Sequence, residues 1–234
     1  KGRSSKTAVF IAHRGSCLVD SEYYPNVLRI AKSYISTKDV NIATLAKFEK
    51  LWSSNIARNT PAFLSSVPVS AFFGAFKGIP AIVVAAGPSL TESIPFIRRN
   101  RDRAVIIAVD TSYFILRRHG IEPHFCVSVD PQVINARYFE GDTAGGTILV
   151  ADPCAHPSAI RLFEGRRVMA GIPFEMMKWI EEISGEKGEL AHGGSVSTNA
   201  YDFARRIGAD PVILTGQDLA FSDGLAHARG SYLD

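Results

Sequence analysis

The tripeptide Gly87-Pro88-Ser89 directly follows an apolar run over residues 81–86 and has the residue types that bind an anion. An apolar run bounded by turn residues is typical of a fully buried strand. Gly87 lets the backbone come close to a ligand, Pro88 suits the first turn of a helix, and Ser89 can bond the free amides there. Because a helix N-terminus at the carboxyl end of a strand attracts anions, the segment favours a nucleotide-phosphate site. A plain strand-to-helix turn is the alternative interpretation.

Two further apolar runs, over residues 104–109 and 124–129, are each followed directly by an aspartate. The first is followed by Asp110 and Thr111, and the second by Asp130. Parallel strands end at one edge of their sheet, so we expect these groups on the same edge as residues 87–89. Asp110 and Asp130 could hold a ribose, a base amine or, through water, a divalent cation. The alternative is that each aspartate caps the helix that follows it.

Gly194 and Ser195 belong to a segment rich in glycine and hydroxyl groups, residues 192–198, which opens a predicted helix. Backbone amides and hydroxyls in such a segment could hold a phosphate without a lysine. The segment is not a P-loop, because no Gly-Lys-Ser/Thr follows at the required spacing. A flexible connector is the alternative.

Gln217, Asp218 and His227 follow the last apolar run, residues 211–215. A carboxylate and an imidazole beyond a strand end are candidates for a general base, since histidine accepts a proton near neutral pH. A histidine in a loop can equally be a solvated surface residue. We therefore take Asp218 and His227 as candidate catalytic residues and Gln217 as a candidate binding residue.

The elements that must position these residues alternate between short apolar runs and helical patterns. Strands are predicted over residues 81–86, 104–109, 124–129, 147–151, 167–170 and 211–215, and helices over residues 90–99, 112–119, 133–139, 155–163, 173–183 and 196–207. This alternation predicts an α/β fold with a doubly wound, mostly parallel, Rossmann-like sheet.

The N-terminal part of the chain has a different pattern. Residues 7–11 are predicted to form a strand. Residues 26–66 are predicted to form two or three helices, because apolar residues such as Val27, Ile30 and Tyr34 recur at helical spacing. The chain is thus expected to divide into an N-terminal strand and helical segment over residues 1–77 and a Rossmann-like domain over residues 78–234, and to be part of a longer protein.

The composition excludes several classes of function. The 234 residues carry a net charge of +3 with 46% hydrophobic and 21% charged residues, as in an ordinary globular protein. No concentrated basic stripe points to nucleic acid, and no apolar stretch approaches the length of a membrane span. No signal peptide opens the chain, and three cysteines without metal-type spacing suggest a reducing compartment. We therefore expect a cytoplasmic protein with no nucleic-acid or membrane partner.

Several of these motifs, taken in order, resemble the motility accessory factor (Maf) family. They are Gly87-Pro-Ser-Leu90, the strand end at Asp110, Ser128-Val-Asp-Pro131, Gly193-Gly-Ser-Val196 and Gly216-Gln-Asp-Leu-Ala-Phe221, and the resemblance covers about residues 78–234. The same core is similar to the archaeal, MptE-like 6-hydroxymethylpterin diphosphokinase and to bacterial sialyltransferases that use CMP-sialic acid. The resemblance to Maf proteins implies transfer of a nonulosonic acid, of the pseudaminic or legionaminic type, from a CMP-activated donor to Ser or Thr of flagellin.

The resemblance also implies roles for individual residues. Residues 87–89 would contact the phosphate or ribose of the donor nucleotide, and Gly194-Ser195 falls where a Ser-Gly pair of the sialyltransferases binds the donor. Asp110 and Asp130 match positions where the sialyltransferases have asparagine near the nucleotide. The change from asparagine to aspartate favours a divalent cation, magnesium or manganese, or a different set of donors.

Two other functions stay open at this point. One is pyrophosphoryl transfer from ATP to a pterin, with Asp110 and Asp130 holding the magnesium that such chemistry requires. The other is a module without catalysis that binds a nucleotide sugar or flagellin. Binding of a ligand without turnover would distinguish this module from an enzyme.

Overall fold

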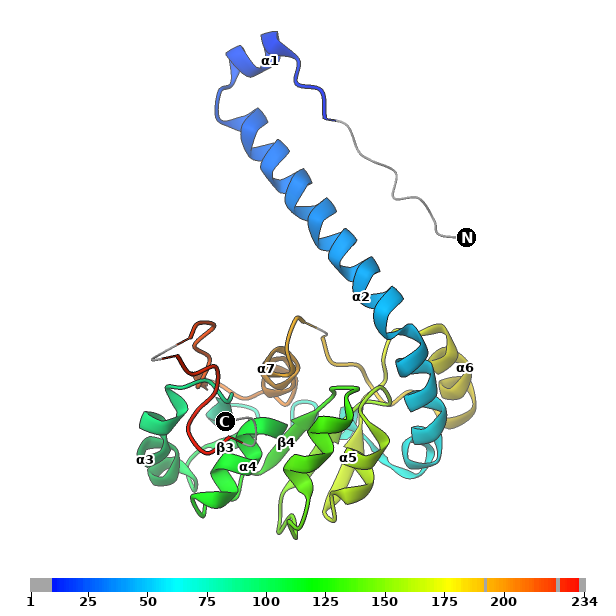
Figure 1. Ribbon diagram of the computed structural model, residues 1–234, viewed down its shortest axis with the longest axis vertical. Coiled ribbons are helices and arrows are strands. Elements are labelled where there is room, and N and C mark those ends of the chain that lie inside the picture. The colour runs from blue at the N-terminus through cyan, green and yellow to red at the C-terminus, as the bar shows by residue number, and fades with distance from the viewer. Residues whose placement is uncertain (1–9, 192, 222–223, 232–234) are drawn as a thin grey trace. The chain divides into compact units, whose positions relative to one another are not determined.

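The computed structural model describes residues 10–191, 193–221 and 224–231, with the side chains of all of these except residues 36–47 (Figure 1). Contacts divide the chain into two compact units, Lys1–Lys50 and Leu51–Asp234. In the first unit, the short helix α1 (Arg14–Val19) precedes the start of helix α2 (Tyr23–Ser65). Residues 10 and 11 are not in a strand, and the rest of the strand expected over residues 7–11 lies outside the described residues.

Helix α2 is one continuous helix of 43 residues, so the expectation of two or three helices over residues 26–66 was wrong. The physical reason is that the sequence has no glycine or proline between Asn26 and Thr60 to interrupt the helical hydrogen bonds. Pro61 lies within the helix close to its end, where it removes the amide donor of one helical turn. None of the described helices combines the length and the apolar character that a membrane crossing requires.

The second unit is built around a parallel sheet of seven strands in the order β1-β6-β5-β4-β3-β2-β7. The strands are β1 (Val67–Pro68), β2 (Ala81–Val84), β3 (Val105–Val109), β4 (Phe125–Ser128), β5 (Ile148–Ala151), β6 (Arg166–Met169) and β7 (Val212–Thr215). Every strand predicted between residues 81 and 215 is present, and the predicted α/β class with a parallel, Rossmann-like sheet is confirmed. Strand β1 was not predicted, because two residues form no apolar run.

Helices cover both faces of this sheet (Figure 1). On one face, α3 (Leu90–Asn100), α4 (Asp110–Arg118), η2 (Val133–Phe139), α5 (Pro157–Leu162) and α6 (Glu175–Ser184) share a core with the end of α2. On the other face, α7 (Val196–Arg206) and the 3-10 helix η1 (Val69–Phe72) share a second core. Alternate strand residues supply the two cores, for example Ile82 to the first and Val83 to the second. The helix predicted over residues 133–139 is the 3-10 helix η2 rather than an α-helix.

The strand order explains why α7 lies on the opposite face. The chain steps from β2 to β6 in one direction across the sheet, then crosses back to place β7 beside β2. Right-handed crossovers in opposite directions put their helices on opposite faces. The carboxyl ends of β2 and β7 therefore form the switch point of the sheet, the place where open α/β sheets bind ligands.

Candidate functional site

At the switch point, the backbones of the loops after β2 and β7 come into direct contact. The amide of Gly87 donates to the carbonyl oxygen of Gly216 at 2.8 Å, which continues the pairing of the two strands. A Cβ atom on Gly87 would collide with the Asp218 carboxylate and with the Gly216 carbonyl oxygen. The close approach that the sequence suggested at Gly87 is thus made, in this structure, to the chain's own loop after β7.

The Asp218 carboxylate lies at the N-terminus of α3, where it accepts hydrogen bonds from Ser89. The Ser89 amide donates to Oδ1 and Oδ2 at 3.3 and 3.2 Å, and the Ser89 hydroxyl donates to Oδ2 at 2.9 Å. The Ser89 hydroxyl caps no amide of α3, because it is directed to this carboxylate. Helix N-termini favour negative charge, so a carboxylate is stabilised here. Residues predicted from two separate motifs, Gly87 and Ser89 from one and Asp218 from the other, therefore meet at one point.

Asp110 is the first residue of α4 and is only 1% exposed. Its Oδ1 accepts from the amide and hydroxyl of Thr111 at 2.8 and 3.3 Å. Its Oδ2 accepts from the Ser128 hydroxyl at 2.9 Å and the Asn135 amide at 3.0 Å. Burial raises the pKa of this carboxyl, although the hydrogen bonds oppose the shift. Asp110 therefore joins β3, β4 and η2 beneath the carboxyl edge of the sheet.

Asp130 follows β4 and is half-buried, with one oxygen accepting from the Gln132 amide at 2.8 Å. The predicted cation site at Asp110 and Asp130 fits this arrangement poorly. Each oxygen of Asp110 already accepts two hydrogen bonds and has no lone pair left for a cation. Across the described residues, no three His, Cys, Asp or Glu side chains group as metal ligands. The divalent cation stays a prediction.

The loop after β7 returns to the end of β2 and brings His227 there. Ala228 is fully buried, and its amide donates to the Ala86 carbonyl oxygen at 2.8 Å. His227 and Gln217 are both half-buried in this loop. The structure thus brings the two predicted base candidates, Asp218 and His227, to one strand end.

The start of α7 is the second predicted phosphate-binding segment. Ser195 precedes the first helical residue, and its side chain makes no capping hydrogen bond to the amides of this helix. The Ser195 hydroxyl lies 2.7 Å from that of Ser197. A Cβ atom on Gly194 would meet nothing within 4 Å, so the space beside this turn is open, in contrast to that at Gly87. His192, from the same segment, lies outside the described residues.

Two buried asparagines of α2, which were not predicted from the sequence, support this edge. Asn55 Nδ2 donates to the carbonyl oxygen of Pro131 at 3.2 Å and to that of Cys154, in the loop over residues 153–155, at 2.9 Å. Asn59 Nδ2 donates to two carbonyl oxygens of the same loop, at 3.0 and 2.8 Å. Residues four apart share one face of a helix. An Asn pair at this spacing, among apolar positions, was the signal that could have identified them.

A further carboxyl at this edge, Asp152, was also not predicted. It follows β5 and is 2% exposed, and its Oδ1 accepts from the amides of Cys154 and Ala155 at 2.7 and 3.1 Å. Burial raises the pKa of this carboxyl to about 7. The signal was the same as at Asp110 and Asp130, an acidic residue directly after an apolar run.

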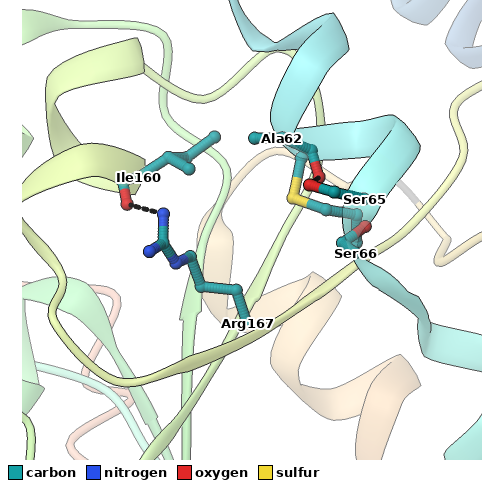
Figure 2. Close-up of a pocket in the computed structure, with 6 residues that line it drawn as sticks. Ala62, Ser65, Ser66, Ile160 and Arg167 are labelled. Atoms are coloured by element: carbon teal, nitrogen blue, oxygen red, sulfur yellow. Dashed lines mark hydrogen bonds between the residues drawn. The ribbon is translucent and has the colours of Figure 1, made fainter.

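A cavity of about 250 Å³ lies away from these residues, between the end of α2, α5 and β6 (Figure 2). It is lined by Ala62, Ser65, Ser66, Ile160, Arg167 and Met169. Figure 2 shows the Arg167 guanidinium directed at the Ile160 carbonyl oxygen, to which it donates at 3.0 Å. None of the predicted site residues lines this cavity.

The fold and its switch point define a Rossmann-like α/β protein. Its helices α3 and α7 begin at one edge of the sheet, where backbone amides and serine hydroxyls are suited to bind an anion. The sequence pattern of the family described as 6-hydroxymethylpterin diphosphokinase MptE-like matches residues 54–224. The chain belongs to this family, which confirms the relationship that the order of motifs suggested.

Among solved structures, the chain is similar to the Maf glycosyltransferase from Magnetospirillum magneticum AMB-1. The two are 22% identical with a TM-score of 0.60, over 74% of this chain and 29% of that one. They share the fold at this level of identity. Three uncharacterized proteins of Treponema pallidum (strain Nichols) are 28%, 29% and 29% identical over 136, 127 and 157 residues, which are 50%, 49% and 65% of this chain. The chain spans 62%, 32% and 27% of their respective lengths.

Proposed function

We propose that this chain is the donor-binding core of a glycosyltransferase, which moves a nonulosonic acid of the pseudaminic or legionaminic type from a CMP-activated donor to Ser or Thr of flagellin. One observation carries the proposal: two helices, α3 and α7, begin at the carboxyl edge of one parallel sheet, at Ser89 and Ser195. Helix N-termini with hydroxyl groups bind phosphate. The likeness of the fold to a Maf glycosyltransferase supports the choice of reaction.

In the proposed reaction, the bond between the anomeric carbon and the CMP phosphate oxygen breaks, and a bond from that carbon to the acceptor oxygen forms. The amides at Ser89 and Ser195 would stabilise the charge that develops on the departing CMP. The acceptor hydroxyl loses its proton to a base, for which Asp218 and His227 are the candidates. Gln217 and Asp130 are the polar groups beside this edge that would contact the ribose or the base.

The family name supports a second function, pyrophosphoryl transfer from ATP to 6-hydroxymethylpterin. That reaction uses a metal ion between the phosphates. The poor fit of the Asp110 carboxylate to a cation makes us rank this function second.

Calorimetric titration with CMP, CDP, ATP and GTP tests the proposal. We expect cytidine nucleotides to bind best. We also expect Ser195→Ala to lower the affinity for CMP roughly tenfold or more, because a hydrogen bond to a charged group is lost. Ser184→Ala, at the end of α6 and bonded to the Gly185 carbonyl, is the matched control and should bind like the wild type.

Preference for ATP would move the pterin reaction to first place. Failure of every nucleotide to bind would contradict both enzymes and favour a module that binds flagellin without catalysis.

A further inference from the structure

We propose that Asp218 is a built-in competitor for the anion site at the start of α3. In the ligand-free protein its carboxylate occupies the place of a ligand phosphate, and the ligand binds only after this carboxylate has left. The inference rests on the proposed function in one respect, that the ligand carries a phosphate. It adds a regulatory step that the proposed function does not require.

The donors that hold Asp218 are those that a phosphate would use. Both of its oxygens share the Ser89 amide, at 3.3 and 3.2 Å, and Oδ2 also accepts the Ser89 hydroxyl at 2.9 Å. The carboxylate sits against the Cα of Gly87, where a side chain would collide with it. A carboxylate and a phosphate carry like charges and need the same two donors, so the two cannot occupy this site together.

Several features of the contact between Asp218 and Ser89 favour its release. Ser89 supplies all the hydrogen bonds to Asp218 that the described residues make, and no cationic side chain of that part of the chain forms an ion pair with it. The next residue, Leu219, has a φ of 54°, a conformation that is strained for a side chain other than glycine. Leu219 is also 88% exposed, so it does not anchor the loop by burial. Departure of Asp218 would cost the hydrogen bonds of one residue only.

The consequence is a lower apparent affinity for anions. When the binding-competent state is a fraction of the molecules, the apparent dissociation constant rises by the inverse of that fraction. If about one molecule in ten has Asp218 displaced, the wild type binds roughly tenfold more weakly than a chain without this competitor. Removal of the charge at residue 218 should therefore improve binding.

Asp218→Asn keeps the shape of the side chain and removes its charge. We expect it to bind both inorganic pyrophosphate and CMP roughly tenfold more tightly than the wild type in calorimetric titrations. Glu92→Gln is the matched control, because it removes a charge from the first turn of the same helix without contact to Ser89 in the structure. This control should change the affinity less than twofold. Equal or weaker binding by Asp218→Asn would overturn the proposal and identify Asp218 as a permanent cap of α3.

A second measurement uses the wild type and does not depend on the variant's folding. Saturating pyrophosphate should speed amide hydrogen exchange over residues 217–221 several-fold, because the loop loses its contact with Ser89. Unchanged or slower exchange there would contradict the proposal.

The two proposals can fail separately. Tighter pyrophosphate binding by Asp218→Asn, with no preference for cytidine over other nucleotides, would support the competitor and reject the CMP-sugar function. Cytidine preference with no gain in Asp218→Asn would do the reverse.

Discussion

The substitution Asp152→Asn is expected to remove most of a loss of stability that the wild-type protein undergoes between about pH 4 and pH 7. The ordinary pKa of an aspartate is 3.8, whereas burial raises that of Asp152 to about 7. Between these values the unfolded chain has released a proton that the folded protein retains, so the free energy of unfolding falls as the pH rises and levels off above pH 7. The difference between the two pKa values corresponds to roughly 4 kcal/mol.

Urea unfolding of both proteins at intervals from pH 4 to pH 8 measures this effect. The variant should keep a shallower slope of the same sign, because burial also raises the pKa of Asp110. Asp102→Asn replaces an exposed carboxylate and should reproduce the wild-type slope. Parallel wild-type and Asp152→Asn curves would show that Asp152 ionises normally in the folded protein.

Asn59→Ala is expected to lower the free energy of unfolding by roughly 2–4 kcal/mol, because two buried carbonyl oxygens lose their donor at once. These carbonyls belong to Pro153 and Ala155, and Asn59 is itself buried. The same loop holds Asp152 through two of its amides. Loss of the Asn59 side chain should therefore loosen the carboxyl edge beside β5 as well as destabilise the domain.

Chemical denaturation measures the loss for Asn59→Ala. Arg58→Ala, an exposed neighbour on the same helix, is the control and should stay within about 0.5 kcal/mol of the wild type. Asn55→Ala should behave like Asn59→Ala, since it also leaves two carbonyls without a donor. A loss below about 1 kcal/mol for both asparagines would mean that water replaces their amides.

The strands were predictable because burial on both faces requires an unbroken apolar run, which is visible in a few consecutive residues. Residues 105–109 and 125–128 are such runs, and each became a strand. Strand β1 could not be found in this way. Val67 and Pro68 form a strand only because Val168 and Met169 of β6 lie alongside them.

The helical nature of residues 26–66 was predictable from periodicity, but the number of helices was not. Periodicity reports which face of a helix is apolar, and an interruption requires glycine, proline or tertiary contacts. Without a breaker before Pro61, the chain continued as one helix. The type of helix was not predictable either. The helical pattern over residues 133–139 became a 3-10 helix, in which the Asn135 side chain donates a hydrogen bond to Asp110.

The sequence by itself determined the edge at which the candidate site forms. Parallel strands share one direction, so Gly87, Asp110, Asp130 and Asp218, each just beyond an apolar run, had to lie on the same side of the sheet. Their roles at that edge remain predictions, but their common location follows from local pattern and strand direction alone.

Only the tertiary structure decided which groups meet there. Ser89 and Asp218 are 129 residues apart in the chain, and their contact exists because β7 crosses back to lie beside β2. The same holds for Asn59 and the loop after β5, which are brought together by the packing of α2 on one face of the sheet. A hydrogen bond depends on positions within a few tenths of an ångström, and such positions are set by strand order and packing, which no local pattern of residue types contains.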